Sequence, residues 1–222
     1  MQTAEEKKSV KGEDMTKTGK PLCKQCRKAE EKLYLKGIRC EGAKCPIESK
    51  AKKGRGKKFY KKKISEYGMQ LKEKNKVKIF YGMLEKQFRK YFEMAKKSKG
   101  VTGEILLQFL ERRLDNVVYK LKWTYSKRMS KQLVTHGSIF INGKKLDRPG
   151  YLVKIGDEIQ IKPNSKCVKT VKECIESKKN SLIPLWLELD EKELKARALR
   201  VPGRDEVSIS IDEQAIVNLY SK

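Results

Sequence analysis

The sequence predicts an α+β fold in which a helical domain carries an N-terminal cysteine-containing lobe and an inserted domain of two helices and a β-hairpin. Apolar residues recur every three or four positions between residues 77 and 121, which is typical of amphipathic helices. Short apolar runs lie between residues 139 and 161 and are separated by Asn-Gly and Gly-Asp turns, as expected for hairpin strands. Four cysteines lie between residues 21 and 48, where apolar side chains are few.

Length and charge limit the class of protein. At 222 residues the chain can bury one or two cores, and its net charge of +26 is extreme for a globular protein. Like charges at this density oppose folding unless a polyanion neutralises them, and nucleic acid is the usual partner of that kind. No apolar run approaches the ~20 residues that span a bilayer, so we expect no membrane partner. The first 20 residues contain no hydrophobic block, which favours a cytoplasmic protein without a targeting segment.

The cysteine spacing predicts a metal site. A C-x2-C pair and a C-x4-C pair provide the thiolates that one structural, tetrahedral Zn²⁺ requires. Metal binding would supply the folding free energy that this apolar-poor lobe lacks. Four unligated buried thiols, or an iron–sulfur cluster, are the alternatives. The predicted zinc ligands are Cys23, Cys26, Cys40 and Cys45, whereas Cys167 and Cys174 are expected to be ordinary small hydrophobes.

A basic run follows the cysteine lobe. Residues 49–65 carry nine Lys or Arg and no acidic residue, which indicates an extended arm that follows a phosphate backbone. The predicted contacts in this arm are Lys50, Lys52, Lys53, Arg55, Lys57, Lys58, Lys61, Lys62 and Lys63.

Two amphipathic helices are expected next, one on each side of a joint at residues 101–103. Lysines before Gly100 suit the end of the first helix. The apolar stripe consists of Val77, Phe80, Leu84, Phe88, Tyr91 and Ala95 in the first helix, and of Leu106, Phe109, Leu110, Leu114, Val117, Val118 and Leu121 in the second.

Residues 126–146 carry the strongest functional signal. Ser126 can cap a short helix that Gly137 ends, and Asn142-Gly143 suits a two-residue hairpin turn. Met129, Leu133 and Val134 form the buried stripe, which leaves the basic residues of the helix on open faces. A small rigid platform with cations on one side suits a phosphate backbone, so this segment indicates RNA binding. Its predicted contacts are Lys127, Arg128, Lys131, Gln132, His136, Lys144 and Lys145, with Arg112 and Arg113 on the preceding helix.

The remainder of the chain is expected to complete both domains. Strands are predicted at 152–155 and 158–161, a weak helix at 168–179, and an edge strand at 182–189. The tail has alternating Val207, Ile209 and Ile211 and then a helix from Asp212. We therefore predict a disordered tail at 1–16, a zinc-binding and helical domain at 17–102 completed by 196–222, and a small RNA-binding domain at 103–195.

Taken in order, these motifs resemble the family of bacterial small-subunit ribosomal protein four over about residues 17–222. Residues 49–58, Lys122, Met129 and Ser130 depart from the family pattern. The resemblance is carried by the cysteine spacing and by SEYGMQLKEKNKVK at 65–78, YGMLEKQFRKYF at 81–92, LERRLDNVVYKL at 110–121, KQLVTHGSIFINGKKL at 131–146, YLVKIGDEI at 151–159 and EQAIVNLYSK at 213–222.

The resemblance implies a structural protein of the small ribosomal subunit. It implies primary binding to small-subunit ribosomal RNA, early assembly of the five-prime domain, contact with the neighbouring small-subunit protein five, and a place near the channel by which mRNA enters. Regulation of its own translation or of transcription is a further implication. We expect neither an enzyme nor a homo-oligomer.

Two other functions fit parts of the sequence. Arg113-Leu114-Asp115 is similar to the Arg-Leu-Asp setting of the aspartate in pseudouridine synthases, although here it lies within an amphipathic helix, where Asp115 is expected to be a helix-surface salt-bridge partner. A zinc-dependent DNA-binding regulator would explain the charge and the cysteines but not the helix–hairpin platform. His136, the one histidine, is expected at a helix end or in an RNA hydrogen bond rather than in acid–base catalysis. Trp123 and Tyr125 are expected to pack, whereas Tyr34 and Tyr60 are candidates for base stacking.

Overall fold

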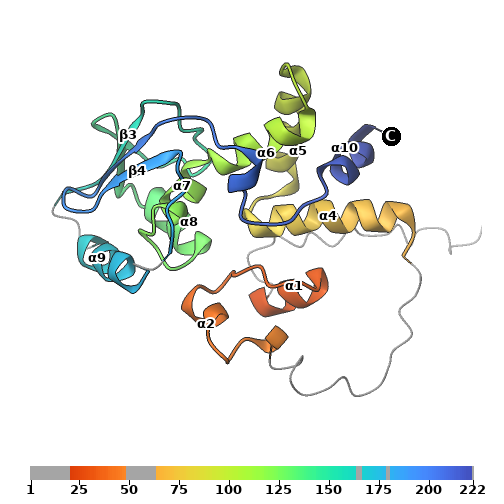
Figure 1. Cartoon of the computed structure of the whole chain (residues 1–222), viewed down its shortest axis with the longest axis horizontal. Helices are drawn as coiled ribbons and strands as arrows, with labels where there is room; N and C mark the ends of the chain where they lie inside the picture. The colour runs from red at the N-terminus through yellow and green to blue at the C-terminus, as the bar shows by residue number, and fades with distance from the viewer. Residues whose placement is uncertain (1–20, 49–63, 164–166, 179–180, 222) are drawn as a thin grey trace, which may run out of the picture.

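The structure, a computed structural model, describes residues 21–48, 64–163, 167–178 and 181–221. These residues form two hydrophobic cores, one among helices and one between helices and a five-stranded sheet (Figure 1). This arrangement confirms the predicted α+β class. The basic run at 49–63 and the tail at 1–20 lie outside the described residues, as do the predicted contacts Lys50 to Lys63 and Tyr60.

The helical domain brings together segments from both ends of the chain. Helix α10 packs on α4 and α6, and α5 packs on α6, so that the C-terminal helix completes a core begun before residue 100. Ser65 caps α4 by accepting a hydrogen bond from Gly68 N at 3.2 Å. The helices of this domain are α1 (Leu22–Ala29), α2 (Ile38–Glu41), α4 (Glu66–Phe80), α5 (Glu85–Lys97), α6 (Thr102–Glu111) and α10 (Glu213–Ser221), and a 3-10 turn η1 (Arg204–Glu206) precedes α10.

Helices α4 and α5 replace the single helix predicted from the first apolar stripe. Gly82 has a φ of +60°, which interrupts the helical path between them. Leu84, which the stripe places inward, is 48 % exposed because it lies in this turn. The spacing of three and four residues continues across the turn, so periodicity alone does not reveal the break.

The second predicted helix is also divided. Arg113 adopts an extended conformation between α6 and α7 (Leu114–Lys120) and forms an isolated β-bridge with Leu152. Leu114 N donates to Tyr151 O at 2.9 Å, and Val153 N donates to Arg112 O at 2.9 Å. A distant segment therefore satisfies the backbone groups that the break exposes.

The second core lies on an antiparallel sheet with strand order β2-β1-β3-β5-β4. Trp123 and Trp186 are buried in it, which confirms packing as the role of Trp123. Its elements are α7, α8 (Lys127–Thr135), α9 (Cys167–Ser177), β1 (Ile139–Ile141), β2 (Lys144–Leu146), β3 (Glu158–Ile161), β4 (Leu187–Asp190) and β5 (Lys195–Ala198).

Most predicted elements of this part are present with altered limits. The weak helix is α9, and the edge strand is β4, which begins at Leu187 after Pro184 rather than at Leu182. Residues 152–155 contain only the bridge at Leu152 instead of a strand. The two cores meet at the α6–α7 junction, since Leu106 and Leu110 belong to the helical core and Leu114 belongs to the other. The predicted domain limit at residue 103 is therefore earlier than the division between the cores.

The predicted zinc site is wrong. All four cysteines lie within the described residues and line one small pocket. Among those residues, however, no group of three or more His, Cys, Asp or Glu side chains is arranged to hold a metal ion.

The N-terminal lobe is held by packing against the helical domain, in place of the expected metal ion. Cys26, Ala29 and Leu33 are buried in the helical core, next to α4. Two ion pairs join the lobe to α4: Lys72 Nζ lies 2.8 Å from Glu30 Oε2, and Lys76 Nζ lies 2.8 Å from Glu31 Oε2. The lobe has too few apolar residues to form a core alone, and its buried residues pack in the core of the helical domain instead.

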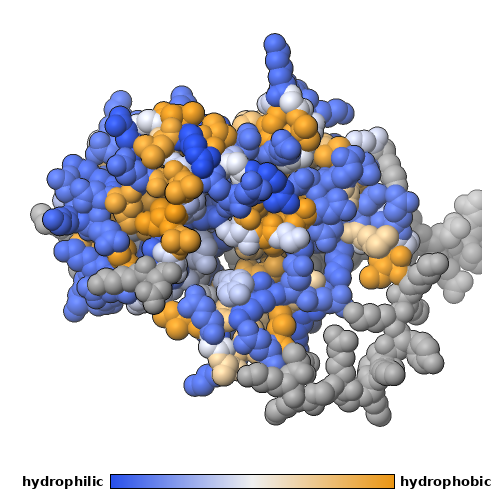
Figure 2. Space-filling view, viewed as in Figure 1, coloured by the Kyte–Doolittle hydropathy of each residue, from blue (hydrophilic) through white to orange (hydrophobic). Residues whose placement is uncertain are grey.

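The described surface is largely polar. Hydrophilic residues cover most of the face shown in Figure 2, and apolar residues gather in smaller patches. No helix among the described segments has the length and apolar character needed to cross a membrane.

Candidate nucleic-acid interface

Helix α8 begins and ends as its sequence predicts. Ser126 Oγ accepts a hydrogen bond from Met129 N at 3.3 Å, and Gly137, with a φ of +68°, follows the helix end. Leu133 and Val134 are buried, while Met129 is half-buried. The amphipathic pattern therefore correctly places Leu133 and Val134 in the second core.

The hairpin turn is held by a buried carboxylate. Asn142 and Gly143 have φ angles of 49° and +76°, as a two-residue turn with positive φ at both positions requires. Asn142 Nδ2 donates to Asp157 Oδ1 at 2.9 Å, and Glu158 N donates to Asn142 Oδ1 at 2.9 Å. These bonds tie the β1–β2 turn to the start of β3, so Lys144 and Lys145 stand on a fixed backbone.

The helix end and the hairpin lie in contact. A Cβ atom on Gly137 would lie 2.1 Å from Lys145 Cε, so the Lys145 stem passes directly over the end of α8. Lys162 is also close, because its N–H donates to Ser138 O at 2.9 Å. Sequence reasoning missed Lys162, since only the pairing of β1 with β3 brings this residue to the helix end.

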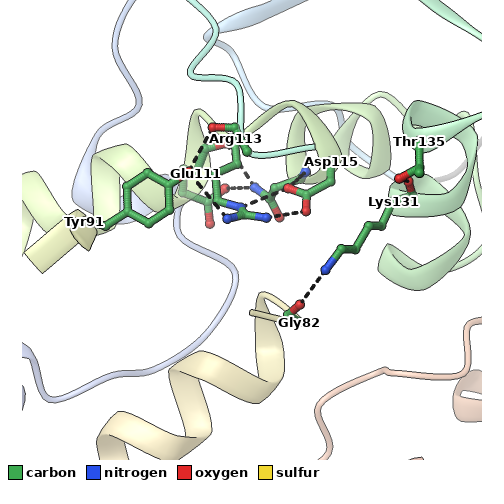
Figure 3. Close-up of polar contacts among 9 residues, drawn as sticks. Gly82, Tyr91, Glu111, Arg113, Asp115, Lys131 and Thr135 are labelled. Atoms are coloured by element: carbon green, nitrogen blue, oxygen red, sulfur yellow. Dashed lines mark hydrogen bonds and ion pairs between the residues drawn. The ribbon is translucent and has the colours of Figure 1, made fainter. Parts of the chain in front are cut away.

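Five of the predicted contacts are exposed on this platform. They are Arg128, Gln132, His136, Lys144 and Lys145. Lys131 is half-buried, and its Nζ donates to Gly82 O at 3.2 Å (Figure 3). This hydrogen bond links α8 to the turn that follows α4. The exposed set supplies donors and positive charge without an accompanying acidic side chain in α8 or β2.

The open position predicted for Lys127 is wrong. Its Nζ is buried against the rings of Phe80, Tyr81 and Tyr119, at 3.3, 4.4 and 5.7 Å from their centroids. Burial lowers the pKa of Lys127 to about 7. In this conformation the ammonium faces the aromatic side chains of the protein rather than a phosphate.

Arg113 and Asp115 are also buried, contrary to the prediction of an RNA contact and of a helix-surface pair. Arg113 is 1 % exposed and forms two hydrogen bonds with the Asp115 carboxylate (Figure 3). Burial would lower the pKa of Arg113, but the facing carboxylate of Asp115 raises it. Asp115, whose sequence setting is similar to that of the aspartate in pseudouridine synthases, is therefore half of a buried ion pair with Arg113.

Arg112 is half-buried as well. Its Nε donates to Val153 O at 2.9 Å, and burial lowers its pKa. The guanidinium supports the loop before β3, so its position is fixed by the fold. The exposed cations on α8 and the hairpin are therefore the better candidates for phosphate contacts.

Comparison with known proteins finds matches to two family models. The model described as "Ribosomal protein S4/S9 N-terminal domain" matches residues 17–111, and the model described as "S4 domain" matches residues 112–159. The chain is similar to proteins named small ribosomal subunit protein uS4. It is 48 % identical to that of Ruminiclostridium cellulolyticum, over 90 % of this chain and 96 % of the relative, and 46 % identical to that of Desulforamulus reducens, over 91 % and 97 %.

Proposed function

Since the chain belongs to the family of small ribosomal subunit protein uS4, we propose that it binds small-subunit ribosomal RNA as a structural protein of that subunit. The observation that carries the proposal is the α8–hairpin platform, on which Arg128, Lys144 and Lys145 are exposed while the backbone beneath them is fixed. The family implies that the protein lies in the small subunit of cytoplasmic ribosomes.

The physical mechanism is binding without a chemical step. Exposed Lys and Arg side chains release counterions condensed on the phosphates, and this gives an affinity that falls steeply as salt rises. Structured RNA is recognised mainly by shape, phosphates and 2′-hydroxyls, which suits a rigid platform more than flexible loops. Gln132 and His136 add hydrogen-bonding groups beside the cations.

The finer role concerns assembly and neighbours. We propose that the protein is a primary RNA binder that nucleates the five-prime domain, lies near the channel by which mRNA enters, and contacts small-subunit protein five. Charge is unevenly distributed along the sequence: residues 21–65 hold 16 Lys or Arg against 4 acidic residues, whereas residues 182–222 hold 6 against 8. A protein neighbour is therefore better accommodated by the C-terminal part. Binding to regulatory RNA would use the same platform.

A binding competition tests the function. Affinity of the full chain should be measured for a folded five-prime-domain fragment of small-subunit ribosomal RNA and for duplex DNA of similar length, at the same salt concentrations. We expect the RNA to bind at least ten times more tightly across the salt series, since a basic surface alone would bind both. Equal affinity for both nucleic acids would contradict the ribosomal function and favour a general DNA-binding protein.

A further inference from the structure

Lys127 lies in an aromatic cage that the RNA-binding surface does not use. Its Nζ is 3.3 Å from the centroid of the Phe80 ring, 4.4 Å from that of Tyr81 and 5.7 Å from that of Tyr119. No hydrogen-bond partner for this Nζ lies among the described residues. Cation–π attraction, rather than an ion pair with a carboxylate, is therefore the direct contact of the ammonium.

The cage joins the two cores. Phe80 and Tyr81 are buried in the helical core at the end of α4, whereas Lys127 stands at the start of α8 in the other domain. One turn further along α8, Lys131 Nζ donates to Gly82 O at 3.2 Å (Figure 3). Two residues on one face of α8 thus contact three consecutive residues of the α4–α5 turn.

Buried hydrogen bonds lie beside this contact. Tyr81 OH donates to Glu111 Oε1 at 2.7 Å, and Asn116 Nδ2 donates to Glu111 Oε2 at 2.7 Å. Tyr81 directly follows α4, Glu111 ends α6 and Asn116 lies in α7, and their side chains are buried. The cage wall is therefore fixed to the α6–α7 junction, where the two cores meet.

We propose that Lys127 is a positioning residue that fixes the α8–hairpin platform relative to the helical domain by filling the cage between them. Its consequence for affinity rests on the proposed RNA binding. A platform held at one angle presents its exposed cations together with those of the N-terminal lobe, so the RNA does not have to order the two domains. When this contact is lost, a smaller fraction of the protein molecules has the two domains aligned. The apparent affinity for RNA falls in proportion to that fraction.

Two substitutions separate this role from a phosphate contact. Lys127→Met removes the charge but keeps a long side chain that packs well against aromatic rings, whereas Lys127→Ala empties the cage. We expect Lys127→Ala to weaken RNA binding about fivefold, if the aligned population falls to about one fifth, and Lys127→Met to retain most of the affinity. Neither should change the slope of log affinity against log salt, because neither removes a phosphate contact.

The neighbouring exposed residue gives the matched control. Arg128→Met and Arg128→Ala should weaken binding equally, and each should reduce the salt slope by about one. If Lys127→Met and Lys127→Ala instead behave like this pair, Lys127 leaves the cage to bind phosphate and the proposal is overturned. Wild-type protein that fails to prefer the RNA would overturn the proposed function while leaving the interdomain measurement below unaffected.

Interdomain order is measured independently of RNA. Spin labels carried by non-natural amino acids at exposed Lys96 and Lys169 leave the native cysteines unlabelled. We expect a broader distance distribution for Lys127→Ala than for wild type or Lys127→Met. A distribution unchanged by Lys127→Ala would overturn the proposal.

A second variant acts from the other side of the cage, should Lys127→Ala fail to fold. Phe80→Leu keeps an apolar side chain but removes the nearest ring. It should broaden the distance distribution in the Lys127 protein and in Lys127→Met, because both side chains pack against this ring. A distance distribution that Phe80→Leu leaves unchanged in both backgrounds would contradict the proposal.

Discussion

The Arg113 guanidinium and the Asp115 carboxylate face each other two residues apart and form a bidentate pair, with Nε 3.0 Å from Oδ1 and Nη2 2.5 Å from Oδ2. The pair lies where α6 ends and α7 begins, and Tyr91 OH, which donates to Gly150 O at 2.9 Å, stands beside the guanidinium. The boundary between the two cores is therefore fixed by buried polar groups that satisfy one another.

Breaking this pair should destabilise the whole chain. Asp115→Asn leaves the Arg113 charge buried without its partner, and we expect the free energy of unfolding to fall by about 3 kcal/mol. Urea denaturation followed by circular dichroism measures the change. Asp147→Asn, at an exposed position in the hairpin region, is the matched control and should change stability by less than about 0.5 kcal/mol. Equal stabilities for the two variants would contradict a structural role for the pair.

The exposed cations of the platform should govern the salt dependence of RNA binding. Reversing Arg128, Lys144 and Lys145 to Glu removes three exposed positive charges that we propose contact phosphates, so we expect at least tenfold weaker binding and a salt slope reduced by about two to three. Filter binding at several salt concentrations gives both quantities.

Exposed lysines elsewhere in the same domain provide the control for this charge reversal. Changing Lys169, Lys172 and Lys192 to Glu alters the net charge by the same amount. A general electrostatic effect would weaken binding in both triple variants equally, and that result would show that the platform is not the RNA-binding face.

Glu85 should make stability depend on pH below about 4.5. It is the first residue of α5, and it accepts hydrogen bonds from Lys78, from Lys74 Nζ at 2.9 Å and from Tyr220 OH at 2.7 Å. Burial alone would raise the pKa of Glu85, but these donors lower it to about 2 from its ordinary value of 4.5. Because the folded pKa lies below the unfolded one, the stabilisation is complete above pH 4.5 and is lost as pH falls towards 2.

Comparison with Glu85→Gln isolates this dependence. Wild type should be the more stable protein at pH 6, and the difference in free energy of unfolding should shrink at pH 3, when denaturation is measured in urea at each pH. Glu93→Gln removes an exposed carboxylate paired with Arg89 and should show little change with pH. A wild-type advantage over Glu85→Gln that stays constant from pH 6 to pH 3 would contradict the assignment.

Sequence patterns predicted elements well where local rules decide the structure. Ser126, Gly137 and Asn142-Gly143 have strong local preferences, and α8 and its hairpin have the expected limits. The breaks at Gly82 and Arg113 were missed because the apolar spacing continues through them. At Arg113 the backbone is extended because it pairs with Leu152, 39 positions later, and no local pattern contains that partner.

Contacts between distant segments also explain why the sequence predicted the exposure of only some residues of the candidate site. The pattern of an amphipathic helix predicts that its basic residues are exposed, but a distant element can cover one of them. Lys127 is covered by Phe80 and Tyr81 from another domain, whereas Arg128 remains open. The cysteine spacing indicated a metal because the lobe's apolar content is low, but the missing core is supplied by α4.

Gly137 should be essential to the contact between α8 and the hairpin. Its φ of +68° is unfavourable for an L-residue by roughly 1–2 kcal/mol, and its added Cβ would also lie 2.1 Å from Lys145 Cε. Gly143 shares the positive φ, at +76°, but a Cβ there would meet nothing within 4 Å. Gly143→Ala therefore measures the conformational effect alone, and we expect Gly137→Ala to destabilise the protein only slightly more, because the flexible, exposed end of the Lys145 side chain can move aside.

Removing the obstructing side chain distinguishes the two causes. In a Lys145→Ala background the steric conflict is absent, so Gly137→Ala should then destabilise by about the same amount as Gly143→Ala, on the order of 1–2 kcal/mol. Thermal and urea denaturation of the three single variants and the Gly137→Ala/Lys145→Ala double variant give the comparison. If Gly137→Ala is equally destabilising with and without the Lys145 side chain, that side chain does not constrain the end of α8.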